Sequence, residues 1–294
     1  MPWADKEGNF QLPIQEDGTA LVVYSLWAYY CKYRDVEFIR SLYRNLIKNA
    51  ADFMVKFREP HTRLPAPSYN LWEDRRGIHS FTVAAVWAAL QAAANFTETF
   101  GEVTLTKQYR QAAAEIKDAT IVHLFDKVQG RFLRSIEVKA DGSIQRDCVI
   151  DSSISGFFLF GMFEPTDSLI ESTMTALKDR LWCNTEVGGM ARYENDSSMQ
   201  VTQDLTNVPG NPWFVCTLWL AQYFIAKAQS LADLETALNI LQWACRCAMP
   251  SGVLAEQVNP YNRNPLSVSP LTWSHAALVI AVQEYLNKYR RLQQ

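Results

Sequence analysis

The sequence predicts an all-α protein whose helices stack as hairpins around a common centre. Apolar residues recur at spacings of three and four along most of the chain, which is the period of a helix with one buried face. Long loops that contain proline and glycine separate these segments, and we expect function to lie in them, at one end of the helices. No glycine-serine linker or shift in composition divides the 294 residues. We therefore predict a single domain over 1–294.

Caps and breakers give the order of the elements. Asp17 and Asp35 are expected to cap the first two helices, and prolines between 60 and 67 force a loop. Alternating apolar residues on either side of Asp141-Gly142 predict a small β-hairpin insertion within 130–148. The periodicity predicts about nine or ten helices, with ranges of 20–33, 35–57, 80–100, 106–125, 152–163, 167–181, 212–229, 234–248 and 271–291.

Composition excludes several classes of function. A net charge of -3, with lysine and arginine spread along the chain, offers no basic patch for nucleic acid. The apolar windows fall short of about 18 residues, so no membrane span is expected. Residues 1–7 lack the basic and apolar regions of a secretory signal, which favours a cytoplasmic protein. Six cysteines show no zinc spacing, and we predict buried free thiols and no metal site: Cys31, Cys148, Cys183, Cys216, Cys245 and Cys247.

The first loop with candidate catalytic residues has two acids and two arginines directly after Trp72. One interpretation is a solvated helix entry, in which the helix dipole favours Glu73 and Asp74. The alternative is that Glu73 lies against the Trp72 indole. Desolvation would then raise the pKa of the Glu73 carboxyl, so that it donates a proton near neutral pH. Such a carboxyl is suited to protonating a glycosidic oxygen.

The second loop combines paired glycines with an arginine. Gly188 and Gly189 let the backbone pass close to a ligand, and Arg192 offers a rigid fork of donors to hydroxyls or to a carboxylate. Trp213 would add a stacking surface. The structural alternative is a turn followed by a helix with Pro212 at its first position, and both interpretations can hold together.

The third loop contains a lone acid. Glu256 stands in an apolar and amide-rich stretch, with no lysine or arginine until Arg263. It is either a buried, hydrogen-bonded structural residue or a carboxylate placed to activate water.

Together the loops resemble glycoside hydrolase family 15, the glucoamylase and glucodextranase family, over about 15–285. The matching motifs are Tyr69-Asn70-Leu71-Trp72-Glu73-Asp74, Arg192-Tyr193 with Gly210-Asn211-Pro212-Trp213-Phe214, and Ala255-Glu256-Gln257 with Leu271-Thr272-Trp273-Ser274-His275-Ala276. The resemblance implies an (α/α)6 barrel, in which inner and outer helices surround a pocket built from loops at one end. It also implies inversion at the anomeric carbon and no metal or organic cofactor.

The resemblance assigns roles to residues of this chain. Glu73 is implied as the general acid and Glu256 as the general base, with their carboxyl groups about 6.5 to 9.5 Å apart so that a water fits between base and sugar. The substrate-binding residues are implied to be Trp72, Asp74, Arg192, Trp213, Tyr69 and Asn70. Two of these depart from the pattern, because the family commonly has Asp where Asn70 stands and Glu where Asp74 stands.

The resemblance predicts an inverting hydrolase that releases β-glucose from non-reducing ends of α-linked oligo- or polysaccharides. Alternatives are a hydrolase of another glucoside, such as dextran or trehalose, and a non-catalytic module resembling the glucoamylase-like region of phosphorylase kinase regulatory subunits. A plain helical repeat protein is disfavoured because no sequence unit repeats. The chain has fewer predicted helices than a complete barrel and no counterpart, before Gln15, of the family's sugar-binding Arg-Asp pair. We therefore expect either a catalytic domain without its first helices and any preceding β domain, or a shortened member of the family with a damaged pocket.

Overall fold

The computed structural model describes residues 3–4, 10–11 and 14–294, and this part of the chain is mostly helical, as predicted. The chain divides into two compact units. The first comprises Met1–Lys127, Phe132–Cys148 and Phe160–Met162, and the second comprises Val128–Arg131, Val149–Leu159 and Phe163–Gln294. A single domain over 1–294 stays a prediction. Most of residues 1–7, on which the expectation about a secretory signal depends, lies outside the described residues.

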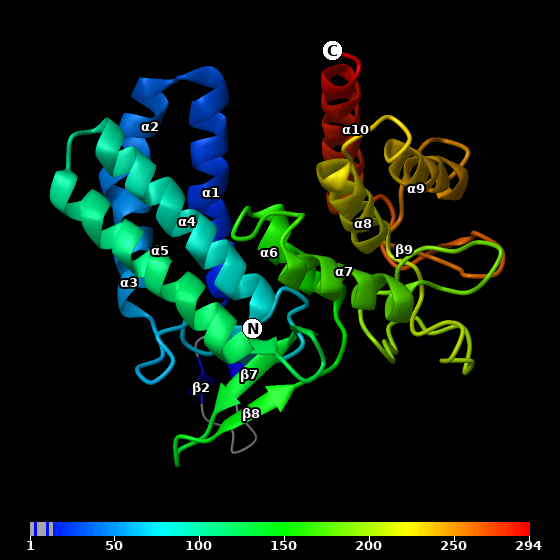
Figure 1. Ribbon diagram of the computed structural model, residues 1–294, viewed down its shortest axis with the longest axis horizontal. Helices are drawn as coiled ribbons and strands as arrows, with labels where there is room; N and C mark the ends of the chain where they lie inside the picture. Colours follow the sequence, from blue (N-terminus) through cyan, green and yellow to red (C-terminus); the bar gives the residue numbers. More distant parts are fainter. Residues whose placement is uncertain (1–2, 5–9, 12–13) are drawn as a thin grey trace. The chain divides into compact units, whose positions relative to one another are not determined.

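The first unit is built around one alanine-rich helix. Helix α4 packs against both α1 and α5 (Figure 1). Buried positions lie on every side of α4, as expected for a central helix, and its alanines allow close approach of its neighbours. The helices of this unit are α1 (Glu16–Tyr33), α2 (Val36–Leu42), α3 (Asn49–Lys56), α4 (Ser80–Thr99) and α5 (Val103–Leu124), with a π-helical segment at Tyr43–Lys48 between α2 and α3.

The two predicted aspartate caps have different outcomes. Asp35 caps α2 as predicted, and its carboxylate accepts a hydrogen bond from the Phe38 backbone N–H at 3.0 Å. The prediction for Asp17 is wrong, since α1 already begins at Glu16 and Gln15 is its N-cap. Asp17 lies in the first turn of α1 instead. Its carboxylate accepts a hydrogen bond from Thr82 Oγ1 of α4 at 3.0 Å, so a tertiary contact positions it.

The predicted hairpin is confirmed and belongs to a larger sheet. Strands β7 (Ser135–Val138) and β8 (Ile144–Asp147) pair antiparallel. Strands β4 (Arg76–His79) and β3 (Ser68–Tyr69) extend this pair to an antiparallel sheet of order β3-β4-β7-β8. The remaining strands of the first part of the chain are β1 (Trp3–Ala4), β2 (Phe10–Gln11), β5 (Phe125–Asp126) and β6 (Arg131–Phe132). Because β3 and β4 flank the first loop, the sheet positions that loop.

The second unit packs α8 against both α9 and α10 (Figure 1). Its elements are the 3-10 helix Ser152–Ser155, α6 (Gly156–Leu159), α7 (Ser168–Leu181), α8 (Phe214–Lys227), α9 (Leu234–Cys247), β9 (Gln257–Val258), β10 (Pro265–Leu266) and α10 (Thr272–Leu292). No helix in the described part of the chain is long and apolar enough to cross a membrane.

Three expectations about this part of the chain are corrected. The predicted helix over 152–163 ends at Leu159, because Gly161 adopts a φ of 74° that a helix does not continue. Helix α8 begins at Phe214, so Pro212 precedes it in extended backbone that pairs with Ala191. The cysteines are thiols, but only half of them are buried: Cys183, Cys216 and Cys247 are buried, whereas Cys31, Cys148 and Cys245 are exposed.

Candidate functional site

The first loop is organised by the side chain of Asn70. Its Oδ1 accepts hydrogen bonds from the backbone N–H groups of Asp74 and Arg75, at 3.1 and 3.3 Å. Its Nδ2 donates to Asp74 Oδ1 at 2.8 Å. Arg75 completes the arrangement with a bidentate pair to the Asp74 carboxylate, at 2.9 and 2.8 Å. The Asp74 carboxylate is therefore engaged within the loop.

Glu73 stands at the tip of this loop. Its backbone N–H donates to the Asn70 carbonyl at 2.9 Å, and its φ of 58° is a left-handed conformation that a side chain rarely adopts. The Glu73 side chain is exposed, and it makes no hydrogen bond or ion pair with another described residue, while Trp72 and Tyr69 are half-buried. The helix-entry interpretation is wrong, because a strand separates Glu73 from α4, and the exposed side chain does not show the expected desolvation against the Trp72 indole. The turn between β3 and β4 presents the carboxyl group to solvent.

Two acids near this loop are buried, although sequence reasoning identified Asp17 only as a helix cap and did not identify Glu16. Glu16 and Asp17, at the start of α1, are 0% and 1% exposed. Burial raises the pKa of Glu16 well above its usual value, and the charge of Asp17 adds to the rise. Both carboxylate oxygens of Glu16 lack a hydrogen-bond partner among the described residues. An acidic pair before an apolar helix is typical of a helix start, which conceals the burial.

Asp17 gives a testable pH dependence. The pKa of Asp17 is raised from 3.8 to about 6, chiefly by burial and to a smaller extent by the charge of Glu73, which together outweigh the lowering by the hydrogen bonds of Thr82 and the Gly18 backbone. The folded chain thus binds the proton more tightly than the unfolded chain. The free energy of unfolding therefore falls as pH rises from about 4 to 6, by up to about 3 kcal/mol from this group. We expect Asp17→Asn to lose this decline in urea unfolding, and the exposed Asp118→Asn to keep it. Parallel pH profiles for wild type and Asp17→Asn would contradict the assignment.

The second loop holds Arg192 in a bidentate ion pair. Its Nε and Nη2 donate to the two carboxylate oxygens of Asp196, at 2.9 and 2.7 Å. The Asp196 side chain is 0% exposed and the Arg192 side chain 12%. The carboxylate also accepts the backbone N–H of Ser198 at 3.0 Å. Sequence reasoning singled out Arg192 but not Asp196, and the spacing of four residues was no signal, because this segment is not helical.

Two aromatic rings flank the Arg192 guanidinium. Its central carbon lies 4.6 Å from the ring centroid of Tyr193 and 4.7 Å from that of Trp213. Burial works to lower the pKa of Arg192, but the hydrogen bonds and charge of Asp196 outweigh it and raise that pKa. Trp213 is only 4% exposed. Its ring is thus covered by Arg192, so that within this unit it positions the guanidinium.

The paired glycines of this loop are required by two indole rings. A Cβ on Gly188 would lie 2.9 Å from Trp182 Cζ2, and a Cβ on Gly189 would lie 2.6 Å from Trp243 Cζ2. Both glycines have positive φ angles, 71° and 99°. The expected close approach is real, but the groups approached are tryptophans of the chain itself.

Gly189→Ala is expected to lower the free energy of unfolding strongly. Gly252→Ala is the matched control, because Gly252 also has a positive φ but no atom lies within 4 Å of the position that its Cβ would take. The left-handed backbone alone costs about 1–2 kcal/mol in the control. Overpacking against Trp243 and Pro212 adds about 1–3 kcal/mol in Gly189→Ala. If urea unfolding shows the same decrease in the free energy of unfolding for Gly189→Ala and Gly252→Ala, crowding at Gly189 does not contribute to the destabilisation.

The third loop places Glu256 beside the start of α8. Its backbone carbonyl accepts the N–H of Phe214 at 3.2 Å, and its own N–H donates to the Val268 carbonyl at 2.9 Å. The side chain is half-buried. Ser267 Oγ donates to Glu256 Oε2 at 2.5 Å, and Gln257 Nε2 lies 3.5 Å from the same oxygen. Among the described residues, no hydrogen bond falls on Oε1.

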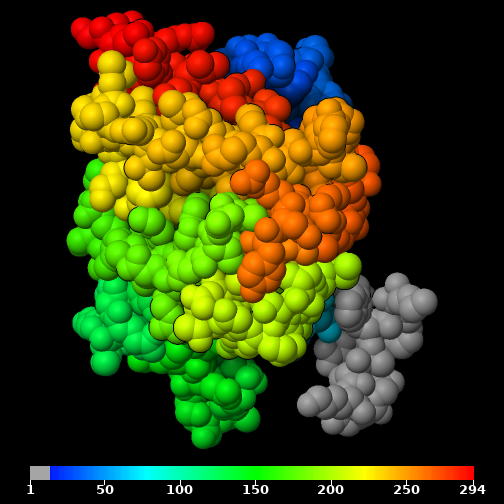
Figure 2. Space-filling view, turned by 90° about the vertical axis from the view of Figure 1, so that its right-hand side faces the viewer, coloured from blue at the N-terminus to red at the C-terminus, as the bar shows by residue number. Residues whose placement is uncertain are grey.

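Side-chain amides connect the second and third loops. Gln257 Nε2 donates to Ser198 Oγ at 3.0 Å, and Asn211 Nδ2 donates to Gln257 Oε1 at 2.9 Å. Asn211 also donates to the Met199 carbonyl at 2.8 Å. Figure 2 shows the segment around 255–270, in orange, lying against the yellow-green segment around 190–205. Glu256 is thus linked to the Arg192–Asp196 pair through Gln257 and Ser198.

The structure therefore gathers the predicted site residues in two groups. Tyr69, Asn70, Trp72, Glu73 and Asp74 lie together in the first unit, and Arg192, Trp213 and Glu256 lie together in the second. The pairing of Glu73 with Glu256 stays a prediction. No group of three or more His, Cys, Asp or Glu side chains in the described ranges could hold a metal ion.

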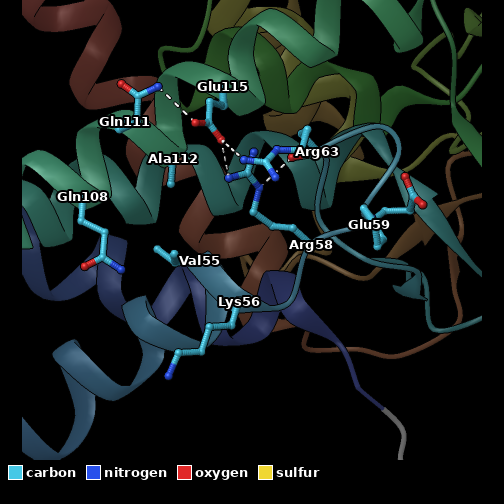
Figure 3. A pocket seen from close by; sticks show the side chains of 10 residues that line it. Val55, Lys56, Arg58, Glu59, Arg63, Gln108, Gln111, Ala112 and Glu115 are labelled. Carbon is cyan, nitrogen blue, oxygen red and sulfur yellow. Dashed lines mark hydrogen bonds and ion pairs between the residues drawn. The ribbon is translucent and has the colours of Figure 1, made fainter.

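A depression of about 420 Å³ between the end of α3 and α5 collects further charges (Figure 3). Arg58 and Arg63 both donate to Glu115 Oε2, at 2.8 and 3.1 Å, and Gln111 donates to Oε1 at 3.1 Å. The Gln111 hydrogen bond, and then that of Arg58, lower the pKa of Glu115 to about 2. A carboxylate held ionised in this way is no proton donor near neutral pH. The cluster fastens the loop after α3 to α5.

Comparison with known proteins identifies the family. The model of "Glycosyl hydrolases family 15" matches residues 8–283. The chain belongs to glycosyl hydrolase family 15. An uncharacterized glycosyl hydrolase of Methanocaldococcus jannaschii is 25% identical over 281 residues, which are 92% of this chain and 42% of the relative. A trehalase of Mycobacterium tuberculosis is 26% identical over 218 residues, 74% of this chain and 29% of the trehalase. The family 15 chain thus spans less than half the length of these relatives.

Solved structures show the same fold. A bacterial glucoamylase complexed with acarbose superposes with a TM-score of 0.76 at 22% identity, covering 94% of this chain and 41% of the glucoamylase. The glucoamylase from Saccharomycopsis fibuligera gives a TM-score of 0.72 at 17% identity, covering 94% of this chain and 70% of that enzyme. The predicted fold class, the (α/α)6 barrel with a small hairpin insertion, is confirmed.

Proposed function

We propose that this family 15 protein is an inverting glycoside hydrolase that releases β-glucose from non-reducing ends of α-glucans. The observation that carries the proposal is the setting of Glu256 in the second unit. Its carboxylate is half-buried, anchored through Oε2, and without a hydrogen bond from the described residues on Oε1. A carboxylate held by one oxygen and open at the other is suited to taking a proton from water.

Glu73 is proposed as the general acid. Its position at the tip of the β3–β4 turn, with an exposed side chain that makes no hydrogen bond or ion pair with a described residue, leaves the carboxyl group accessible to a substrate. In an inverting reaction this acid protonates the leaving glycosidic oxygen, while Glu256 accepts a proton from the water that attacks the anomeric carbon. The reaction needs no cofactor. It requires residues 1–294 to act as one catalytic domain.

The substrate-binding roles are proposals of the same kind. Arg192, which lies near the rings of Tyr193 and Trp213 and is paired with Asp196, would present a guanidinium of fixed orientation to sugar hydroxyls. In the first unit, Asn70 fixes Asp74, while the half-buried rings of Tyr69 and Trp72 offer apolar faces. Arg192, Asn70 and Asp74 are ordered by their hydrogen bonds before any ligand arrives. Such order lowers the entropy lost on binding.

Trehalose is the second candidate substrate. The likeness to a trehalase of Mycobacterium tuberculosis over 74% of the chain favours it. A non-catalytic binding module is the remaining alternative, but a module of that kind has no chemical need for Glu73 and Glu256 together.

The experiment is to incubate the protein with maltooligosaccharides, dextran and trehalose and to follow the anomer of the released glucose by proton NMR. We expect β-glucose to appear first and to mutarotate later. Release of α-glucose would contradict inversion. No release from any of the three substrates would favour the binding module, and turnover of trehalose alone would transfer the proposal to that sugar.

A further inference from the structure

A second depression, of about 400 Å³, lies in the second unit among the end of α7, the following loop, α8 and α9. Small-molecule sites commonly measure about 300–1,000 Å³. Its floor is apolar and partly aromatic, and it includes Trp182, Phe224, Ile240 and Trp243. Trp182 and Phe224 are half-buried, so their rings retain exposed surface, while the other two are buried.

The rim of this depression is polar and mostly unengaged. Lys178, Glu186, Asn239 and Arg246 line it, and all four are exposed. The side chains of Glu186, Asn239 and Arg246 make no hydrogen bond or ion pair with other described residues. The rim therefore offers an acceptor, an amide that donates and accepts, and a set of guanidinium donors around one apolar floor.

The aromatic part of the floor is fixed before a ligand binds. Gly188, with a φ of 71°, allows the backbone to approach Trp182 so closely that a Cβ would lie 2.9 Å from Cζ2. Trp182 also pairs with Met190 in an isolated β-bridge, and the backbone N–H of Trp182 donates to the Lys178 carbonyl at 3.1 Å. The Gly188 backbone and the backbone contacts of Trp182 therefore position the indole.

The depression is separate from the setting of Glu256. Glu256 contacts Phe214, the first residue of α8, whereas Phe224 lies ten positions further along the same helix. Ten residues correspond to about 15 Å along a helix axis. The floor and rim share no residue with the groups that surround Arg192 and Glu256.

We propose that this depression binds one or two glucosyl residues of an α-linked glucan at a distance from the reacting bond. A glucosyl ring has apolar faces of C–H groups and an edge of hydroxyls that both donate and accept, which matches a ring-lined floor with a mixed rim. The ligand class rests on the proposed function.

The experiment measures adsorption of the protein to insoluble starch and, separately, hydrolysis of maltotriose. Asn239→Ala/Arg246→Ala is the test variant, because both residues are exposed and neither packs in the core. The control is Gln242→Ala, an exposed change on the same helix outside the depression. We expect the double variant to adsorb about tenfold more weakly, equivalent to about 1.4 kcal/mol, with maltotriose hydrolysis and thermal unfolding unchanged.

Equal adsorption by wild type, control and double variant would overturn the proposal. Equal weakening in the control and the double variant would also overturn it, because the effect would then lie outside the depression. The proposed hydrolase function is judged independently, by Glu73→Gln and Glu256→Gln. If those variants adsorb normally while no chain hydrolyses any glucan, the proposed function fails and the binding site stands.

Discussion

Asp196→Ala is expected to lower the free energy of unfolding by about 3–5 kcal/mol, a large part of the stability of an ordinary protein. The change leaves the Arg192 guanidinium, 12% exposed, without its bidentate carboxylate. It also removes the acceptor of the Ser198 N–H. Removing one partner of a buried ion pair leaves an uncompensated charge and is strongly destabilising, whereas replacing both partners by apolar residues is often nearly neutral. Urea unfolding, followed by far-ultraviolet circular dichroism, measures the loss.

A double variant separates the charge effect from lost packing. Arg192→Met/Asp196→Ala removes both charges, and we expect it to be more stable than Asp196→Ala alone. Asp204→Ala is the matched control, because Asp204 also caps a turn of the same long loop but is exposed, and its loss is expected to stay below about 1 kcal/mol. If Arg192→Met/Asp196→Ala is less stable than both Asp196→Ala and Asp204→Ala, the buried charge of Arg192 is not the cause of the stability lost in Asp196→Ala.

The helices were predictable because each buries either one apolar face or its whole surface. Buried positions of a helix are apolar and recur every three or four residues, so the sequence pattern reflects burial. Asp35 also acted as predicted, since its hydrogen bond to the Phe38 N–H is local. Asp17 did not, because its carboxylate is directed to Thr82 on α4, sixty-five positions away. A cap signal in the sequence cannot distinguish a local hydrogen bond from a tertiary one.

Among the site residues, too, features set by local sequence were predictable and features set by tertiary contacts were not. Sequence reasoning proposed Arg192 and Glu256 as site residues from their types and their loop settings. It missed the groups that hold them. Asp196 is one of several polar residues of its loop, and Gln257 stands in a matching motif that assigned it no role. Such roles depend on which loops fold together, here the loops around 190–205 and 255–270.

The two departures from the family pattern are explained together by the structure. Asn70 stands where an aspartate is common, and its amide donates to the Asp74 carboxylate at 2.8 Å. An aspartate at position 70 could accept hydrogen bonds but, when ionised, could not donate one. The shorter Asp74 side chain is within reach of both Asn70 and Arg75. The substitutions are therefore mutually compatible in geometry and charge, and neither disturbs the Glu73 backbone turn.

Glu256→Gln and Glu73→Gln are each expected to lower kcat on maltooligosaccharides by about 10²–10⁴-fold, the usual contribution of a positioned acid or base. Glutamine keeps the size and can still accept the hydrogen bond of Ser267 at Glu256, so the fold should persist in both variants. Glu235→Gln, an exposed change in the first turn of α9, is the control for activity.

The two acids are distinguished by the leaving group. On α-glucosyl fluoride, whose fluoride departs without protonation, Glu73→Gln should recover most of its rate because the acid is no longer needed. Glu256→Gln should remain slow, since water must still be deprotonated. The pH profile gives a second readout: loss of the base should remove the acidic limb of kcat/KM, and loss of the acid the basic limb. Equal rates for both variants on the two substrates would show that Glu73 and Glu256 do not divide the reaction as acid and base.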